Sequence, residues 1–147
     1  MHQNDRHAGN LVLIRGACLW MLMALLLAWC MVGLNFGIVP LKDIFAGKFI
    51  RLLQAHIDFL LMSALIFGYY AAKVPFPWHV RWAMVIGAFT NSSLFLLMAI
   101  FPILDTPKVP PPQIFQIYLF ASLLTTSYGF GKGAVLIFHS TVKSKIA

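Results

Sequence analysis

The sequence predicts an all-α membrane protein, a bundle of four transmembrane helices that forms one domain over residues 1–147. Hydrophobic residues make up 61% of the chain and charged residues only 10%, whereas soluble domains carry about 25% charged residues. Four apolar runs reach the length of about 20 residues that a helix needs to cross the hydrocarbon core. The formal charge of +7 comes from Lys and Arg at the ends of these runs, where basic side chains reach anionic lipid. These residues form no polar face, which argues against a nucleic-acid partner.

Each predicted span is bounded by residues that end a helix. Gly37 and Pro40 follow the first span, in a connector with room for a short interfacial helix. Prolines follow the second and third spans, because Pro cannot continue a helix, and a stiff Pro-rich loop leads into the fourth. The first span is too long for the apolar core of a signal peptide, so we expect a retained helix. The predicted spans cover about residues 11–34, 49–72, 78–100 and 113–138.

An even number of spans places both termini on the same side of the membrane. Basic residues are more numerous on that side, so the positive-inside rule predicts cytoplasmic termini in a bacterial-type inner membrane. Trp78 and Trp82 would lie at the inner interface, where aromatic belts form. The basic residues on the side of the termini are Arg6, Arg15, Lys73, Arg81, Lys132, Lys143 and Lys145, and those on the other side are Lys42, Lys48, Arg51 and Lys108.

Polar side chains recur at one depth on three of the predicted spans. His56 and Asp58 lie one to two turns below the outer end of the second span. The third span carries Thr90–Ser93 at a similar level, and the fourth carries Gln116 and Tyr118. Polar groups at membrane depth are costly unless they have partners. A layer of them shared by three helices therefore predicts an intramembrane site.

The chemistry of this site depends on its single histidine. His79 and His139 belong to the other end of the bundle, so His56 has no second histidine at its level. A zinc site needs three or four protein ligands, and a bis-histidine haem needs two that face each other. A haem held by one histidine stays open, because the macrocycle supplies four nitrogens. The alternative is that His56 only forms a hydrogen bond between helices.

Asp58 lies about 200° from His56 around the helix, so it does not orient that ring. We expect Asp58 to accept a hydrogen bond from Asn91, Ser92, Tyr118 or a neighbouring subunit. The alternative is a carrier of protons or a partner for a polar group of a substrate.

Two segments resemble a known group of membrane enzymes. The second span reads Ala-His-Ile-Asp over residues 55–58, after Arg51, and the third reads Gly-Ala-Phe-Thr-Asn over residues 87–91 before ending on Phe-Pro. These segments resemble the Ala-His motif and the Asn-containing third helix of small four-helix membrane isomerases, the styrene oxide isomerase and hydroxylaminobenzene mutase group. Chain length, number of spans and order of loops are similar as well.

The resemblance implies a haem b-dependent membrane isomerase, a homo-oligomer with a trimer favoured, that acts on a small lipophilic substrate. His56 would be the metal ligand, and the ferric iron would act as a Lewis acid that converts an epoxide to a carbonyl. Asn91 matches the family position on the third helix and is a candidate catalytic residue, and Tyr118 is a second candidate because it shares the same depth. Met62 and Phe95 would lie against the cofactor.

The chain departs from the family at two of these positions. Six residues after its histidine the family has Asn, where this chain has Met62, and four residues after the third-helix Asn it has Tyr, where this chain has Phe95. Neither side chain can orient a polar substrate, so we expect aryl epoxide isomerisation to be weak. Met62 is otherwise a residue that fills gaps in a core. A non-catalytic haem protein, or an accessory subunit of a larger membrane complex, is the alternative function.

Overall fold

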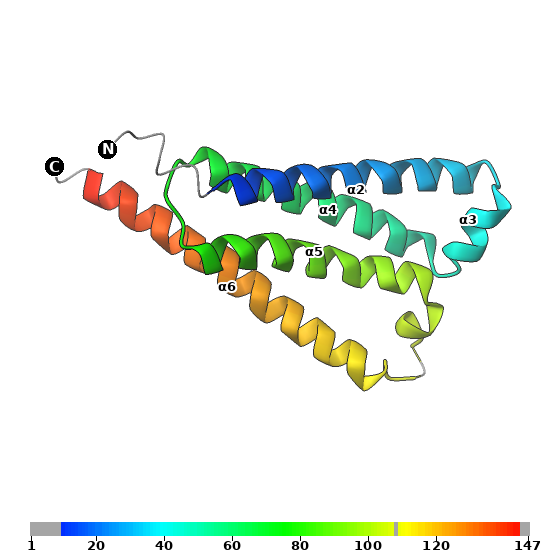
Figure 1. The fold of residues 1–147 in the computed structure, drawn as a ribbon. Helices are drawn as coiled ribbons and strands as arrows, with labels where there is room; N and C mark the ends of the chain where they lie inside the picture. Colours follow the sequence, from blue (N-terminus) through cyan, green and yellow to red (C-terminus); the bar gives the residue numbers. More distant parts are fainter. Residues whose placement is uncertain (1–9, 108, 145–147) are drawn as a thin grey trace.

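The computed structural model describes residues 10–107 and 109–144, and this part of the chain is helical with no β-strand (Figure 1). The all-α prediction is therefore confirmed. Arg6, Lys108 and Lys145, which the topology prediction uses, lie outside the described residues. The elements in chain order are α2 (Leu11–Asn35), α3 (Val39–Ile44), α4 (Phe49–Ala71), α5 (Trp78–Ile100), the 3₁₀ helix η1 (Pro102–Asp105) and α6 (Gln113–Ser144).

The bounds of the long helices follow the signals in the sequence. Helices α2, α4 and α5 begin and end within one residue of the predicted spans, and α3 is the expected short helix of the first connector. Helix α6 continues past the predicted end at residue 138, because no proline or glycine stops it there. By length and composition, α2, α4 and α5 are able to cross a membrane. Helix α6 is 32 residues long, but Gln116 and Lys132 interrupt its apolar character.

The first three long helices pack side by side, and α6 lies across α5 at an angle and diverges from the others toward its own start (Figure 1). Helix α2 begins and α6 ends at the same end of the molecule, beside the α4–α5 connector (Figure 1). We refer to this end of the molecule as the termini end. There, Asn10 links the start of α2 to the α4–α5 connector, because its Nδ2 donates to the carbonyl oxygen of Val74 at 2.8 Å.

Two apolar clusters fill the bundle. One lies toward the termini end and includes Leu13, Ile66 and Met84. The other lies toward the α3 end and includes Leu52 and Phe59. Small residues allow α6 to approach α5 closely. A Cβ atom on Gly87 would lie within 3.0 Å of the Thr126 backbone, and one on Gly129 would lie 2.6 Å from the Met84 nitrogen. Contacts this close require glycine, as in many membrane helix pairs.

Candidate functional site

His56 lies between α4 and α2, with its ring half-buried. Its Nδ1 is 2.8 Å from the carbonyl oxygen of Ala24. A carbonyl oxygen only accepts hydrogen bonds, so Nδ1 carries a proton, and in the neutral ring Nε2 keeps a lone pair. Nε2 makes no hydrogen bond to any residue that the structure describes. Histidines that ligate metals commonly have this arrangement, in which one nitrogen donates to a backbone carbonyl and the other is free to bind the metal.

Asp58 lies on the opposite flank of α4 and bonds to α5. Its Oδ2 accepts one hydrogen bond from Asn91 Nδ2 at 2.9 Å and another from Ser92 Oγ at 2.8 Å. This is the structural partnership expected from the sequence. No Lys or Arg of the described residues forms an ion pair with Asp58. The carboxylate is therefore held by neutral donors, near the middle of α4.

The polar layer continues from α5 to α6 through Ser93 and Tyr118, whose hydroxyl oxygens are 2.7 Å apart. Ser93 has a single hydroxyl proton, which it donates to the carbonyl oxygen of Thr90. Tyr118 is therefore the donor to Ser93 Oγ. Gln116 does not join the layer, because its Nε2 donates to the carbonyl oxygen of Pro111, two residues before α6 begins. The predicted layer thus joins three helices through Asp58, residues 91–93 and Tyr118.

His56 shares the depth of this layer but not its side. It bonds to α2, whereas Asp58 and Asn91 lie between α4 and α5, and Tyr118 lies between α5 and α6. The sequence places these residues at one level, because the rise of a helix is constant. Which neighbour each helix face meets depends on packing. Within one chain, the predicted metal ligand and the predicted catalytic residues are on different sides of α4.

Met62 and Phe95 are also separated. Met62 is buried in the cluster toward the termini end, with Leu13 and Ala17 as fellow members. Phe95 packs against the other cluster, which contains Ala24, the hydrogen-bond partner of His56. Met62 is a core residue.

Aromatic rings fill the space between α2, α4 and α5. Trp20 lies with its ring centroid 4.8 Å from that of Phe89 and 6.1 Å from that of Phe59. Its indole Nε1 donates to the carbonyl oxygen of Val85 at 3.1 Å. Among residues 10–107 and 109–144, no three His, Cys, Asp or Glu side chains come together as a metal site.

Two features of the site have no clear signal in the sequence. The Ala24 carbonyl that orients His56 is a backbone group, which no residue type marks. Ser63 follows Met62 on α4, is fully buried, and its Oγ has no hydrogen-bond partner within the described part of the chain. The spacing of four residues from Ala55 to Phe59 to Ser63 places Ser63 on the buried face of α4, but nothing in the spacing indicates that its hydroxyl lacks a partner.

A charged cluster lies at the α3 end, away from the layer. The Arg51 guanidinium bonds both carboxylate oxygens of Asp105, with 3.0 Å from Nε to Oδ2 and 2.6 Å from Nη2 to Oδ1. Lys48 Nζ is 2.9 Å from Asp105 Oδ2. Hydrogen bonds from Arg51, and then from Lys48, hold the pKa of the Asp105 carboxyl well below its usual range. Through these contacts, Lys48 and Arg51 link the start of α4 to Asp105 in the segment that follows α5.

Comparison with protein families, with curated proteins and with solved structures finds no match to this chain. The roles of the residues above therefore rest on their geometry and chemistry.

Proposed function

We propose that the chain is an integral membrane protein that crosses the bilayer four times, with both termini on the cytoplasmic side of a bacterial-type inner membrane. Three helices have the length and composition for this. Helix α6, at about 1.5 Å per residue, is longer than the hydrocarbon core of about 30 Å. Large apolar side chains are exposed on all four long helices, among them Trp29, Leu61, Ile86 and Ile117. Lipid tails are the surroundings that accommodate such faces.

Within the membrane, the proposed cofactor is haem b, bound through Nε2 of His56. The observation that carries this proposal is the hydrogen bond between His56 Nδ1 and the Ala24 carbonyl, which leaves Nε2 as a lone-pair donor in a fixed orientation. A neutral imidazole of this tautomer would supply one nitrogen ligand to the iron of a haem. Trp20, Phe59 and Phe89 fill the space between α2, α4 and α5, so a haem held by His56 would lie outside that space. Helix α4 also carries exposed apolar side chains, Ile57 and Leu61 among them.

The proposed reaction is isomerisation of a small lipophilic substrate, such as an epoxide to a carbonyl compound. Bound haem would supply a Lewis-acidic iron for the substrate oxygen. Asn91 donates one amide proton to Asp58, which fixes the amide plane and leaves its Oδ1 and second N–H for a substrate. The Tyr118 hydroxyl proton is directed to Ser93, so Tyr118 offers the substrate an acceptor oxygen.

A homo-oligomer, with a trimer favoured by the family resemblance, is part of this proposal. His56 and Asn91 lie on different sides of α4 in one chain. A neighbouring copy packed against α2 and α4 would cover the haem and complete the substrate site with its own polar layer. Without such a partner, the haem face of α4 would be open to lipid.

The second candidate function is a haem protein without catalysis, or an accessory subunit of a larger membrane complex. The placement of Met62 in the core favours it, because this position contributes no polar group to a substrate. Phe95 is an apolar packing residue as well.

The test is the visible absorption spectrum of the purified full-length protein, followed by a turnover assay. A Soret band is expected in the wild type, and His56→Ala should abolish it. His79→Ala and His139→Ala are the matched controls and should keep it, because the His79 ring already bonds to Tyr128. A colourless wild type, or a His56→Ala variant with normal haem content, would contradict the assignment. Because wild-type turnover of aryl epoxides is expected to be weak, aldehyde formation from styrene oxide is compared at matched haem content between the wild type and the double variant Met62→Asn with Phe95→Tyr. A faster double variant supports the isomerase, and a haem-loaded double variant that stays inert supports the non-catalytic alternative.

A further inference from the structure

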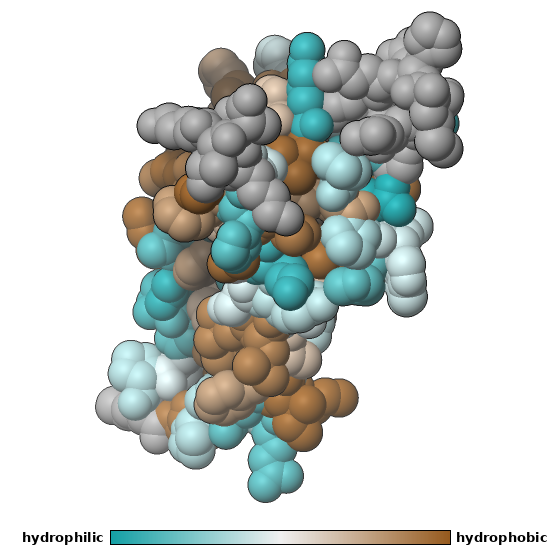
Figure 2. Space-filling model, turned by 90° about the vertical axis from the view of Figure 1, so that its left-hand side faces the viewer, coloured by the Kyte–Doolittle hydropathy of each residue, from teal (hydrophilic) through white to brown (hydrophobic). Residues whose placement is uncertain are grey.

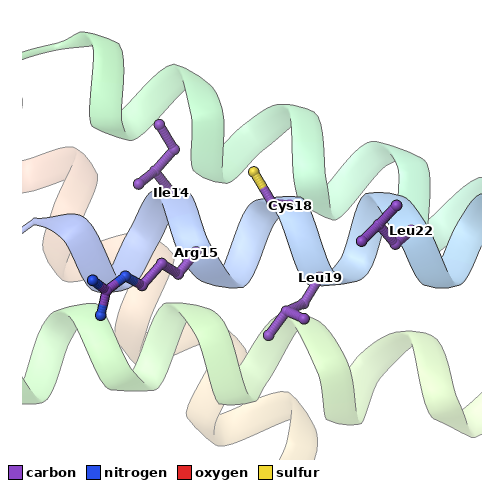
Figure 3. A pocket seen from close by; sticks show the side chains of 5 residues that line it. All are labelled: Ile14, Arg15, Cys18, Leu19 and Leu22. Atoms are coloured by element: carbon purple, nitrogen blue, oxygen red, sulfur yellow. The ribbon is translucent and has the colours of Figure 1, made fainter.

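A shallow hollow of about 540 Å³ lies on the outer face of α2, close to the termini end. Five residues of one helix line it: Ile14, Arg15, Cys18, Leu19 and Leu22 (Figure 3). Arg15 is the only charged group among them. The lining therefore combines one cation with an apolar surface that begins one turn deeper.

Arg15 is exposed and makes no hydrogen bond or ion pair with the residues that the structure describes. Its guanidinium extends toward the start of α2, whereas Cys18, Leu19 and Leu22 follow along the helix in the other direction (Figure 3). Leu22 lies about 10 Å beyond Arg15 along the helix axis. Extension of the charged head toward the helix end, with the apolar stem along the surface, is the usual behaviour of arginine near a membrane interface.

The surroundings of this hollow are positive. Lys73 and Arg81 lie at the same end, at the α4–α5 connector and the start of α5. The acidic residues that the structure describes are elsewhere, Asp43 and Asp105 at the α3 end and Asp58 near the middle of α4. Figure 2 views the molecule from the termini end and shows hydrophilic residues grouped there, beside apolar ones. An anion is therefore attracted to Arg15 without competition from any carboxylate in the described part of the chain.

We infer that this hollow holds one anionic phospholipid. Arg15 binds the headgroup phosphate through charge-assisted N–H···O⁻ hydrogen bonds, and the upper part of an acyl chain lies against Cys18, Leu19 and Leu22. A phosphate with a net negative charge is favoured over a zwitterionic headgroup, because the ammonium of the latter is repelled by the same cations. This inference rests on the proposed placement in the membrane but not on haem.

The two free cysteines of α2 can report binding at this site. Cys18 lies in the hollow, and Cys30, three turns further along the same helix, is the internal control. The full-length protein is purified in an uncharged detergent and stripped of lipid. Phosphatidylglycerol, phosphatidylcholine or inorganic phosphate is then added. Labelling of the two thiols by a small maleimide is timed, and retained lipid is counted by native mass spectrometry. Phosphatidylglycerol should slow the labelling of Cys18 severalfold and leave Cys30 unchanged, and the other two additions should do neither.

Three variants test the assignment. Arg15→Gln should weaken retention of phosphatidylglycerol by about tenfold, the expected effect of losing one charge-assisted contact. Leu22→Trp, at a side chain that is 63% exposed, should fill the hollow and reduce retention while the charge remains. Lys42→Gln, which removes one positive charge at the α3 end, is the control and should retain the lipid.

Retention by Arg15→Gln equal to that of the wild type would overturn the inference. So would equal binding of the two lipids, equal protection of Cys18 and Cys30, or protection by inorganic phosphate alone. None of these readouts depends on haem, so a colourless protein that passes them would overturn only the proposed cofactor.

Discussion

The close approach of α6 to α5 gives the sharpest stability prediction, at Gly129. A Cβ atom at this position would lie 2.6 Å from the backbone nitrogen of Met84 and 2.8 Å from the carbonyl carbon of Ala83. Ordinary contacts of a Cβ begin at 3.4 Å. In Gly129→Ala the two helices must therefore separate by about 0.8 Å, because helix backbone cannot move aside as a flexible side chain can. Overpacking of this kind costs about 1–3 kcal/mol.

Separation of the helices would also weaken the contacts that hold α6 on either side of Gly129. The Tyr118–Ser93 hydrogen bond lies nearer the start of α6 than Gly129 does. On the other side, Tyr69 donates to the carbonyl oxygen of Phe130, the residue after Gly129, at 2.8 Å. Hydrogen bonds between membrane helices contribute about 0.6 kcal/mol each on average. We therefore expect Gly129→Ala to lower the free energy of unfolding by about 2–3 kcal/mol.

Gly131 provides a matched control two residues away on the same helix. A Cβ there meets nothing within 4 Å, and replacing Gly by Ala in a helix is favourable by up to about 1 kcal/mol. The assay is reversible unfolding in mixed micelles, followed by circular dichroism. Gly129→Ala should lower the free energy of unfolding and Gly131→Ala should keep or raise it. Equal stability of the two variants would refute the packing of α6 on α5 described above.

Two further predictions concern the carboxylates. Asp58→Leu leaves the Asn91 and Ser92 donors without their acceptor and should lower the free energy of unfolding by about 1–3 kcal/mol, the cost of leaving a buried donor unsatisfied, whereas Asp58→Asn keeps an acceptor oxygen and should lose much less. Equal losses in the same unfolding assay would show that the charge matters and not the acceptor. For Asp105, the folded-state pKa is lowered, so its contribution to stability is present above its unfolded pKa of about 3.9 and is lost as the pH falls below that value. Unfolding measured from pH 7 to pH 2 should show a stability that declines below about pH 4 in the wild type, and Asp105→Asn should flatten that decline; an unchanged slope would contradict the role of the Arg51–Asp105 pair.

Much of the fold follows from the sequence alone. Apolar runs of about 20 residues and the prolines after them predict α2, α4 and α5 to within one residue, since a helix able to cross a bilayer needs that length and Pro cannot continue it. The common level of Asp58, Asn91 and Tyr118 along the bundle follows as well, because the rise per residue is constant. Asp58 is paired with Asn91 and Ser92 as the sequence predicts.

The tertiary structure decided which of these residues meet. The rotation of α4 directs His56 to the Ala24 carbonyl on α2 and Asp58 to α5, and it buries Met62 in the core. Apolar composition is similar around most of each helix, so the sequence contains little information about this rotation. The Ala24 carbonyl is a backbone group present at every position, and the Arg51–Asp105 pair joins residues 54 positions apart in the chain. Contacts of these kinds depend on how the helices pack in three dimensions, and composition and spacing along the chain do not encode them.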